Sequence, residues 1–303
     1  MMLDIEPLVR EVAPGLLSRR RASVACIATT RRKYLVFDGG MPAQPRCVVE
    51  YGDADRLLRT AHVLRTLSAR LPGVVPAVVS CGPREDGSYV LIQEGLGGVP
   101  WFRVADTMKS AAAWRALLER TLETMTALHM AVRSEPSWLG SFTLGSEVER
   151  QAEIAARTNV ALSNGALQMV RDCRPCSVPI VSFAQHGDYS LNNLLVDRDS
   201  ISVIDFDEFG LTLAPLHDAF GLALSFALSQ DVPTLPRVEV IRACVRRAVA
   251  STPVDAALWP GLLLHHLLLR INQCHGAHRR ARLRRILLDW TDELARTPQT
   301  FLG

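Results

Sequence analysis

Short runs of alternating apolar residues occupy the first third of the chain. Five segments within it are rich in β-branched or aromatic residues and are bounded by turn residues, which is typical of strands. They span residues 22–29, 33–38, 46–51, 77–82 and 88–94. Between the third and fourth, residues 54–71 carry apolar side chains at spacings of three and four, which predicts a helix. The pattern therefore predicts a small antiparallel β lobe with one helix.

The apolar spacing becomes mostly helical after residue 101. We expect a long amphipathic helix over residues 107–132, another beginning at residue 146, and at least two more between residues 253 and 294. Residues 95–100, GLGGVP, contain three glycines and a proline and indicate a hinge. This organisation predicts an N-terminal β lobe of residues 1–94, a hinge of residues 95–100 and a helical lobe of residues 101–303.

One stretch of the helical part has β character. Residues 180–209 predict a strand, a polar loop and two short strands that are joined by the turn DRDS.

Composition limits the classes of protein that fit. The 303 residues are 48% hydrophobic, which is enough for a sizeable core, and the net charge of +3 is too small to favour nucleic acid as a partner. We recognise neither a signal peptide nor an apolar run long enough to span lipid, so we expect a cytoplasmic protein that does not bind membranes. Seven scattered cysteines indicate reduced thiols. The CxxC pair at Cys173 and Cys176 has no second ligand pair and is interpreted as structural.

The polar loop carries the residues with chemical potential. The HGD triplet at residues 186–188 is followed by Asn193 and, after the predicted hairpin, by Asp205 and Asp207. Phosphoryl transfer needs a carboxylate that orients the attacking hydroxyl and accepts its proton, together with oxygen ligands for magnesium. Asp188 suits the first role, whereas Asn193 and Asp205 suit the second, and Asp207 could bind a second ion.

Two segments, HGDYSLNNLL and ISVIDFDEFG, resemble the catalytic and metal-binding segments of aminoglycoside phosphotransferase and choline kinase relatives. The resemblance implies an α+β, bilobal protein-kinase-like fold, in which a small antiparallel β lobe is followed by a larger, mainly helical lobe. It also implies Asp188 as the catalytic aspartate, with His186 as a structural member of the catalytic loop, and Asn193 and Asp205 as Mg²⁺ ligands. Asp218, in the later segment PLHDAFGLAL, would brace that loop.

The same resemblance implies a small-molecule kinase. Such an enzyme transfers the γ-phosphate of ATP or GTP, with Mg²⁺, to a hydroxyl group by in-line attack at the lobe interface, and the backbone from Glu94 to Leu96 would receive the adenine. An antibiotic, with resistance as the consequence, a sugar or related metabolite, an amino alcohol and a protein hydroxyl all stay open as acceptors. The oligomeric state is not predicted.

The chain departs from the family pattern in its β lobe. Glu50 stands where the third strand normally carries a lysine, and Thr60 stands where a helix glutamate is common, so both members of the usual ion pair are expected to be absent. No GxGxxG loop covers the phosphates. The residues that could replace these contacts are Thr29, Thr30, Arg31, Arg32, Lys33 and Arg46. A weak or inactive nucleotide-binding scaffold and a nucleotidyl transferase therefore remain alternatives.

One helix offers a candidate acceptor surface. Its residues recur at spacings of four and three and share a face: Trp259, Leu263, His266, Arg270 and Gln273. Such a stripe lines a pocket or forms a partly exposed face, and both interpretations stay open. His265 is offset from the stripe and is interpreted as a packed histidine. Arginine on this surface favours a neutral or anionic acceptor.

Overall fold

The computed structural model describes residues 5–18, 21–28, 32–39, 44–84, 87–105, 107–229, 236–274 and 280–298. The chain forms two compact units. The first comprises Met1–Lys109 and Asn192–Phe209, and the second comprises Ser110–Leu191 and Gly210–Gly303. Residues 192–209 therefore belong to the β-rich unit although they lie far along the sequence.

An antiparallel sheet forms the centre of the first unit. Its order is β1-β2-β3-β5-β4, and the five strands are those that the alternating pattern predicts. Their bounds are β1 Ser23–Ala28, β2 Arg32–Phe37, β3 Cys47–Gly52, β4 Val78–Pro83 and β5 Tyr89–Glu94.

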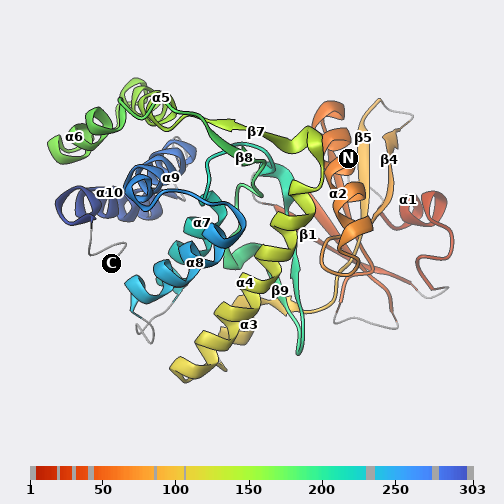
Figure 1. The fold of residues 1–303 in the computed structure, drawn as a ribbon. Coiled ribbons are helices and arrows are strands. Elements are labelled where there is room, and N and C mark those ends of the chain that lie inside the picture. Colours follow the sequence, from red (N-terminus) through yellow and green to blue (C-terminus); the bar gives the residue numbers. More distant parts are fainter. Residues whose placement is uncertain are drawn as a thin grey trace. The chain divides into compact units, whose positions relative to one another are not determined.

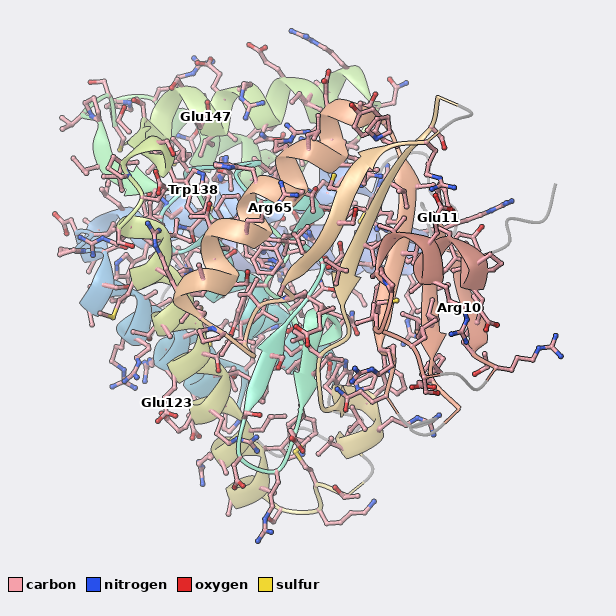
Figure 2. The ribbon with its side chains drawn as sticks, turned by 90° about the vertical axis from the view of Figure 1, so that its right-hand side faces the viewer. Arg10, Glu11, Arg65, Glu123, Trp138 and Glu147 are labelled. Carbon is pink, nitrogen blue, oxygen red and sulfur yellow. The ribbon has the colours of Figure 1, made fainter. Side chains whose placement is uncertain are left out.

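Two helices cover opposite faces of this sheet (Figure 1). The sequence pattern did not indicate α1, Ile5–Val12, which packs Leu8 and Val9 against the apolar side of β3. The predicted helix is α2, Ala54–Arg70, and it begins where the carboxylate of Asp53 accepts a hydrogen bond from the Arg56 backbone N–H. Figure 2 shows Glu11 on α1 and Arg65 on α2, both exposed. Since side chains alternate along a strand, α2 faces the side of β3 that carries Glu50.

A second, three-stranded sheet completes this unit, with the order β10-β9-β6. It joins β6, Val99–Pro100, to the hairpin of β9, Leu194–Val196, and β10, Ile201–Val203. Gly98 has a φ of +94°, and a Cβ at this position would lie 3.0 Å from the backbone of Val196, so only glycine fits the close approach. Short helices follow at α3, Trp101–Ala105, and at the 3-10 turns η2, Leu191–Asn193, and η3, Phe206–Glu208.

Pairing between β6 and β9 changes how the predicted hinge is described. Val99 and Pro100 are paired strand residues, and the compact first unit extends to Lys109. The compact units thus divide the chain at points other than residues 94 and 100. The functional division into residues 1–94, 95–100 and 101–303 stays a prediction.

The second unit is mainly helical. Its helices are α4 Ala111–Arg133, α5 Leu144–Arg157, α6 Asn164–Cys173, α7 His217–Ser229, α8 Arg237–Ser251, α9 Trp259–Gln273 and α10 Ala281–Arg296. An antiparallel pair of strands, β7, Leu139–Phe142, and β8, Ile180–Phe183, completes it together with the 3-10 turns η1, Pro136–Trp138, and η4, Ala256–Leu258. The α+β class is as predicted. The long helix starts later than expected because the Ser110 hydroxyl caps it by accepting from the Ala113 N–H.

The seven cysteines, which all lie within the described residues, form no disulfide. Burial raises the pKa of Cys173, in the CxxC pair, to about 11, which keeps its thiol protonated at neutral pH. Within the described ranges, no helix is both long enough and apolar enough to cross a membrane.

Candidate active site

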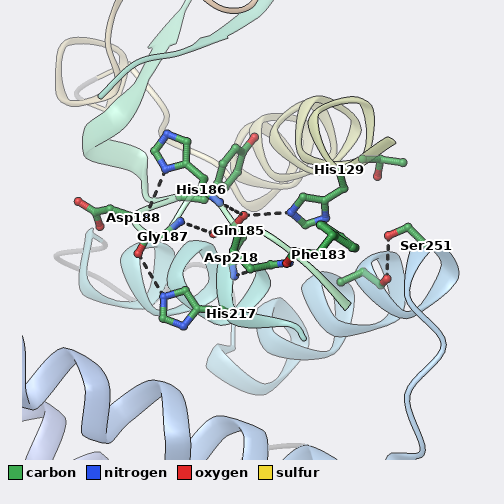
Figure 3. Close-up of polar contacts among 12 residues, drawn as sticks. His129, Phe183, Gln185, His186, Gly187, Asp188, His217, Asp218 and Ser251 are labelled. Carbon is green, nitrogen blue, oxygen red and sulfur yellow. Dashed lines mark hydrogen bonds and ion pairs between the residues drawn. The ribbon is translucent and has the colours of Figure 1, made fainter. Parts of the chain in front are cut away.

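The loop after β8 is held by the carboxylate of Asp218, in the first turn of α7. Its Oδ2 accepts a hydrogen bond from the backbone N–H of His186 at 2.9 Å, and its Oδ1 accepts one from Gly187 at 3.0 Å (Figure 3). Gly187 has a φ of +89°, which turns the chain sharply before Asp188. This is the geometry that the predicted bracing role requires, because two consecutive backbone groups of the loop are fixed by one side chain.

Asp218 is fully buried and carries a stable negative charge. Burial alone would raise its pKa, but the hydrogen bond from His129 Nε2 at 3.0 Å and electrostatic interactions with His129, His186 and His217 lower the pKa to about 2. The carboxylate is therefore ionised and a strong acceptor for the loop at neutral pH.

Two further histidines, His217 and His266, support the loop: His217 contacts it directly, and His266 contacts His217. His217 Nε2 lies 3.1 Å from the carbonyl oxygen of Gly187, and its Nδ1 lies 3.1 Å from Nδ1 of His266. Burial lowers the pKa of both rings, so both are neutral. Since Nε2 of His217 must donate to the carbonyl, its Nδ1 accepts and His266 donates. His266, predicted to line an acceptor surface, is instead 2% exposed and serves as a packing partner of His217.

Asp188 itself is partly accessible. Its backbone N–H donates to Nδ1 of His186 at 3.3 Å, and its Oδ1 accepts a hydrogen bond from Nη2 of Arg270 at 3.0 Å. The side chains of Asp188 and Arg270 are 30% and 20% exposed. Of the five stripe residues on α9, Arg270 is thus the one that the structure brings to the predicted catalytic carboxylate.

The rest of α9 is buried on nearly all sides. Leu263 is inaccessible, whereas Trp259 and Gln273 are only partly buried, so the stripe is at most a partly exposed face. His265 is a packed histidine, as predicted: its ring meets Phe142 edge-on at 5.0 Å, and burial lowers its pKa to about 3.

In the first unit, Lys33 is surrounded by carboxylates. Its Nζ lies 2.9 Å from Oδ1 of Asp205, 3.4 Å from Oδ2 of Asp207 and 3.8 Å from Oε2 of Glu50. Burial alone would lower the pKa of Lys33, but these three charges outweigh it and raise the pKa. Lys33 is therefore an ammonium ion.

Glu50 has a partner that the sequence analysis missed. Nη1 of Arg56, on α2, lies 2.6 Å from Oε1 of Glu50 and 3.3 Å from Oδ1 of Asp207. Burial raises the pKa of Glu50, while Lys33 and Arg56 oppose that rise. The usual pair of a strand lysine and a helix glutamate is absent, as predicted, but a reversed pair occurs in its place: the acid lies on the strand and the base lies on the helix. The sequence analysis expected the helix partner of the strand residue at Thr60. Arg56 lies one helical turn before that position.

The two predicted magnesium ligands lie in one unit and are linked through the backbone. The carbonyl of Asn193 accepts a hydrogen bond from the N–H of Ile204, the residue before Asp205, at 2.9 Å. Asp205 has a φ of +66°, an uncommon conformation outside glycine that is often found at functional sites. The carboxylate oxygens of Asp207 lie beside Lys33 and Arg56, and its binding of a second ion stays a prediction.

The donor set around Asp205 fits magnesium. Its side chain is 40% exposed and already holds the positively charged Lys33, so it favours a cation. Carboxylate and amide oxygens, as in Asp205 and Asn193, are ligands that Mg²⁺ prefers. Among the residues the structure describes, no three His, Cys, Asp or Glu side chains are grouped to hold a metal by themselves. Water and nucleotide phosphates would therefore complete the shell.

The other predicted nucleotide contacts have mixed outcomes. Thr29, Thr30 and Arg31 lie outside the described residues. Arg46 is exposed and directly precedes β3. Its Nε donates to the carbonyl of Leu16 at 3.4 Å, so its side chain is directed toward the segment after α1 and not toward Glu50. Glu94 ends β5 with its side chain exposed, and Leu96 is buried. The predicted adenine contact through this backbone stays a prediction.

The sequence analysis did not identify Arg56 and His129 as site residues. Arg56 was detectable in principle, because it is the basic residue one helical turn before Thr60. His129 gave no signal, since a histidine within an amphipathic helix has no motif around it.

A cavity of about 310 Å³ lies beside the segment of residues 210–213, which follows η3. Polar side chains of β7 and α5 and residues 210–213 line it, among them Ser141, Thr143, Ser146, Glu147, Arg150 and Thr212. The carbonyl of Thr212 also accepts a hydrogen bond from the N–H of Gln185, just before the catalytic loop, at 3.4 Å.

Comparison with known proteins identifies the family. The model of the phosphotransferase enzyme family (APH) matches residues 33–244, over half of the chain, and the chain belongs to this family. No curated protein matches at a significant level.

Solved structures share the fold. One is the aminoglycoside phosphotransferase APH(4)-Ia, a thermostable mutant in a ternary complex with AMP-PNP and hygromycin B, with 18% identity, a TM-score of 0.65, and coverage of 97% of this chain and 98% of the other. Choline kinase from Cryptosporidium parvum Iowa II gives 15% identity, a TM-score of 0.60, and coverage of 97% and 96%. A choline/ethanolamine kinase family protein from Mesorhizobium loti gives 15% identity, a TM-score of 0.62, and coverage of 98% of this chain and 96% of the other. The fold is therefore that of the small-molecule kinases.

Proposed function

We propose that the protein is an ATP-dependent kinase that phosphorylates a hydroxyl group of a small molecule. The acceptor oxygen forms a bond to the γ-phosphorus of ATP, the bond from that phosphorus to the bridging oxygen breaks, and ADP leaves. The proton of the acceptor hydroxyl passes to the carboxylate of Asp188. The products are a phosphate monoester and ADP.

The observation that carries this proposal is the way the loop of Asp188 is fixed. The backbone on its N-terminal side is held by Asp218 and by His217, while Tyr189 on its other side donates its hydroxyl to the carbonyl of Thr121 at 2.9 Å. A carboxylate that is partly exposed on so rigid a loop suits a general base, because catalysis depends on a fixed geometry.

Asn193 and Asp205 would hold Mg²⁺. When bound, the ion neutralises charge on the transferring phosphates and aligns them. The chain's own contribution is the oxygen ligands, supported by the backbone hydrogen bond between Asn193 and Ile204, together with Lys33 next to Asp205.

Arg270 supports a neutral or anionic acceptor. A hydroxyl placed at Asp188 meets the guanidinium of Arg270 nearby, and a polycationic acceptor would be repelled there. The cavity lined by Ser141, Thr143 and Thr212 offers hydroxyl groups that suit a polyhydroxylated compound, and its volume is within the range of small-ligand sites. We therefore favour a sugar or a related metabolite over a polycationic antibiotic.

A screen of acceptors tests the proposal. Purified protein is incubated with Mg-ATP and a panel of neutral, anionic and cationic hydroxyl compounds, ADP formation is followed, and the mass of each product is determined. We expect ADP formation with neutral or anionic members and products that gain one phosphoryl group. A product that gains a nucleotide instead would contradict the reaction.

The alternative is a nucleotide-binding scaffold without turnover. Glu50 at the usual lysine position favours it, because an acidic group repels phosphates. Thermal unfolding with and without Mg-ATP helps to separate the two functions. Stabilisation by Mg-ATP together with ADP formation supports the kinase, stabilisation without turnover in the full panel supports the scaffold, and the lack of both contradicts both.

A further inference from the structure

We infer that Lys33 on β2 binds the nucleotide phosphates in place of the lysine that β3 lacks, and that the reversed pair of Glu50 and Arg56 positions it. This inference rests on the proposed function. It assigns a binding role to one side chain and a positioning role to two others, all in the first unit.

The register of the sheet places Lys33 where a lysine on β3 would be useful. β2 and β3 are antiparallel, and Lys33 lies directly opposite Glu50. Side chains of directly opposite residues emerge on the same face, with Cβ atoms about 5 Å apart. Compared with a lysine on β3, Lys33 therefore lies on the neighbouring strand but projects from the same face of the sheet.

Charge and exposure distinguish the two cations of the cluster. Arg56 lies between Glu50 and Asp207, and its side chain is 14% exposed. Lys33 contacts Asp205 at the more open end of the cluster, where the side chains are 22% and 40% exposed. Of the two, Lys33 is the one that a ligand can reach without first displacing a buried ion pair.

Glu50 is suited to holding Lys33 without neutralising it fully. Its carboxylate is 1% exposed and its close partner is Arg56 at 2.6 Å, whereas Lys33 is 3.8 Å away. A buried acid needs a compensating base, and Arg56 supplies it. Glu50 thus keeps Lys33 near β3, and the ammonium group keeps hydrogen-bonding capacity for phosphate oxygens.

Gly52 makes room for this arrangement. It lies two residues after Glu50 on β3 and so faces the same side of the sheet. A Cβ at Gly52 would lie 2.2 Å from Nη2 of Arg56, closer than atoms can approach. The guanidinium therefore lies against Gly52, and a side chain at this position would force the end of Arg56 to move from its present place.

Lysine usage narrows the choice of cation further. The whole chain has only two lysines, Lys33 and Lys109. Lys109 is exposed, lies beyond α3 and therefore serves as a matched control.

The first experiment measures Mg-ATP affinity by calorimetric titration for the wild type, Lys33→Met and Lys109→Met. We expect Lys33→Met to weaken binding by about 10- to 100-fold, the loss of one charge-assisted phosphate contact, and Lys109→Met to bind as the wild type does. Wild-type affinity in a folded Lys33→Met protein would overturn the inference. If the wild type forms ADP and Lys33→Met forms it at the same rate, the inference fails while the proposed function stands.

The second experiment restores the common polarity in a triple variant, Lys33→Met, Glu50→Lys and Arg56→Glu. This variant returns the lysine to β3 and an acid to α2. We expect it to recover at least tenfold of the affinity that Lys33→Met loses, which a purely structural role of Lys33 would not produce. A triple variant that keeps the wild-type circular dichroism spectrum but binds no better than Lys33→Met would contradict the positioning role of Glu50 and Arg56.

Discussion

Nη2 of Arg270 lies 3.0 Å from Oδ1 of Asp188, so a residue in the last turn of α9 contacts the proposed catalytic base. Through this contact α9, which is otherwise mostly buried, takes part in the proposed active site. It also fixes the orientation of a carboxylate whose backbone is already held by hydrogen bonds to the preceding residues.

Replacing Arg270 should lower turnover more than nucleotide binding. We expect Arg270→Gln to reduce kcat by about 10- to 100-fold, because a small misplacement of a catalytic group costs a factor of this size. The affinity for Mg-ATP should stay within about twofold of the wild type, and Arg270→Lys should recover part of the rate. Steady-state kinetics with titration of Mg-ATP checks this, and a selective loss of ATP affinity would contradict it.

Asp218→Asn should destabilise the second unit. The buried carboxylate accepts hydrogen bonds from two backbone N–H groups and contacts His129, and an amide cannot replace all of these contacts. Removing one partner of a buried charged network costs about 3 kcal/mol. Urea unfolding measures the change. Asp255→Asn, at an exposed cap whose side chain accepts a hydrogen bond from the Ala257 N–H, is the control and should lose about 1 kcal/mol or less. Equal losses for the two variants would contradict the bracing role.

The pKa of His265 makes stability depend on pH in a defined window. Burial lowers the folded-state pKa of this histidine from 6.5 to about 3. Below pH 6.5 the unfolded chain binds a proton that the folded protein does not, so this contribution to stability is complete above pH 6.5 and is lost as the pH falls toward 3.

His265→Leu removes this dependence. Between pH 6.5 and 4, the unfolding free energy of the wild type should fall by about 1.4 kcal/mol per pH unit more steeply than that of the variant. Urea unfolding at several pH values gives both slopes, and the comparison removes the contributions of groups that the two proteins share. Parallel slopes would show that His265 titrates normally in the folded protein.

Gly95 should tolerate no side chain. A Cβ there would lie 1.8 Å from the carbonyl oxygen of Pro45, which is backbone and cannot move aside easily, whereas Gly82 on β4 has open space around it. We expect Gly95→Ala to lower the unfolding free energy by on the order of 2 kcal/mol and Gly82→Ala to change it by about 0.5 kcal/mol or less. A Gly95→Ala protein as stable as the control would show that residues 44–46 can shift.

The strands and long helices were predictable because their signal is local. Alternation of apolar residues identified the five strands of the first sheet, and the spacing of leucines identified α2 and α4. The short helix α1 was missed although its buried residues Ile5, Leu8 and Val9 have helical spacing, because eight residues form only about two turns and are a short segment on which to base a prediction. The hinge at 95–100 was predicted from its glycines and proline, but residues 99 and 100 pair with β9, which lies about a hundred residues later in the chain.

The candidate site was predictable where a motif carries it and not where tertiary contacts do. The HGD triplet and the IDFD segment identified Asp188 and Asp205 in sequence. The partners of those residues come from distant elements: Lys33 reaches Asp205 across 172 positions, and Arg270 reaches Asp188 across 82. The exchanged charges of Glu50 and Arg56 looked like a missing ion pair because a motif comparison checks residue types at fixed positions, whereas an ion pair depends only on opposite charges within reach.

The rate of phosphoryl transfer in Asp188→Asn tests the central claim most directly. It should be measured with the acceptor found in the screen and saturating Mg-ATP, beside Asp199→Asn, which changes an exposed aspartate in the turn between β9 and β10. The account predicts that Asp188→Asn loses about 10²- to 10⁴-fold in turnover, keeps its affinity for Mg-ATP and unfolds as the wild type does, while Asp199→Asn is unaffected. Turnover by Asp188→Asn at the wild-type rate would contradict the role of Asp188 as the catalytic base.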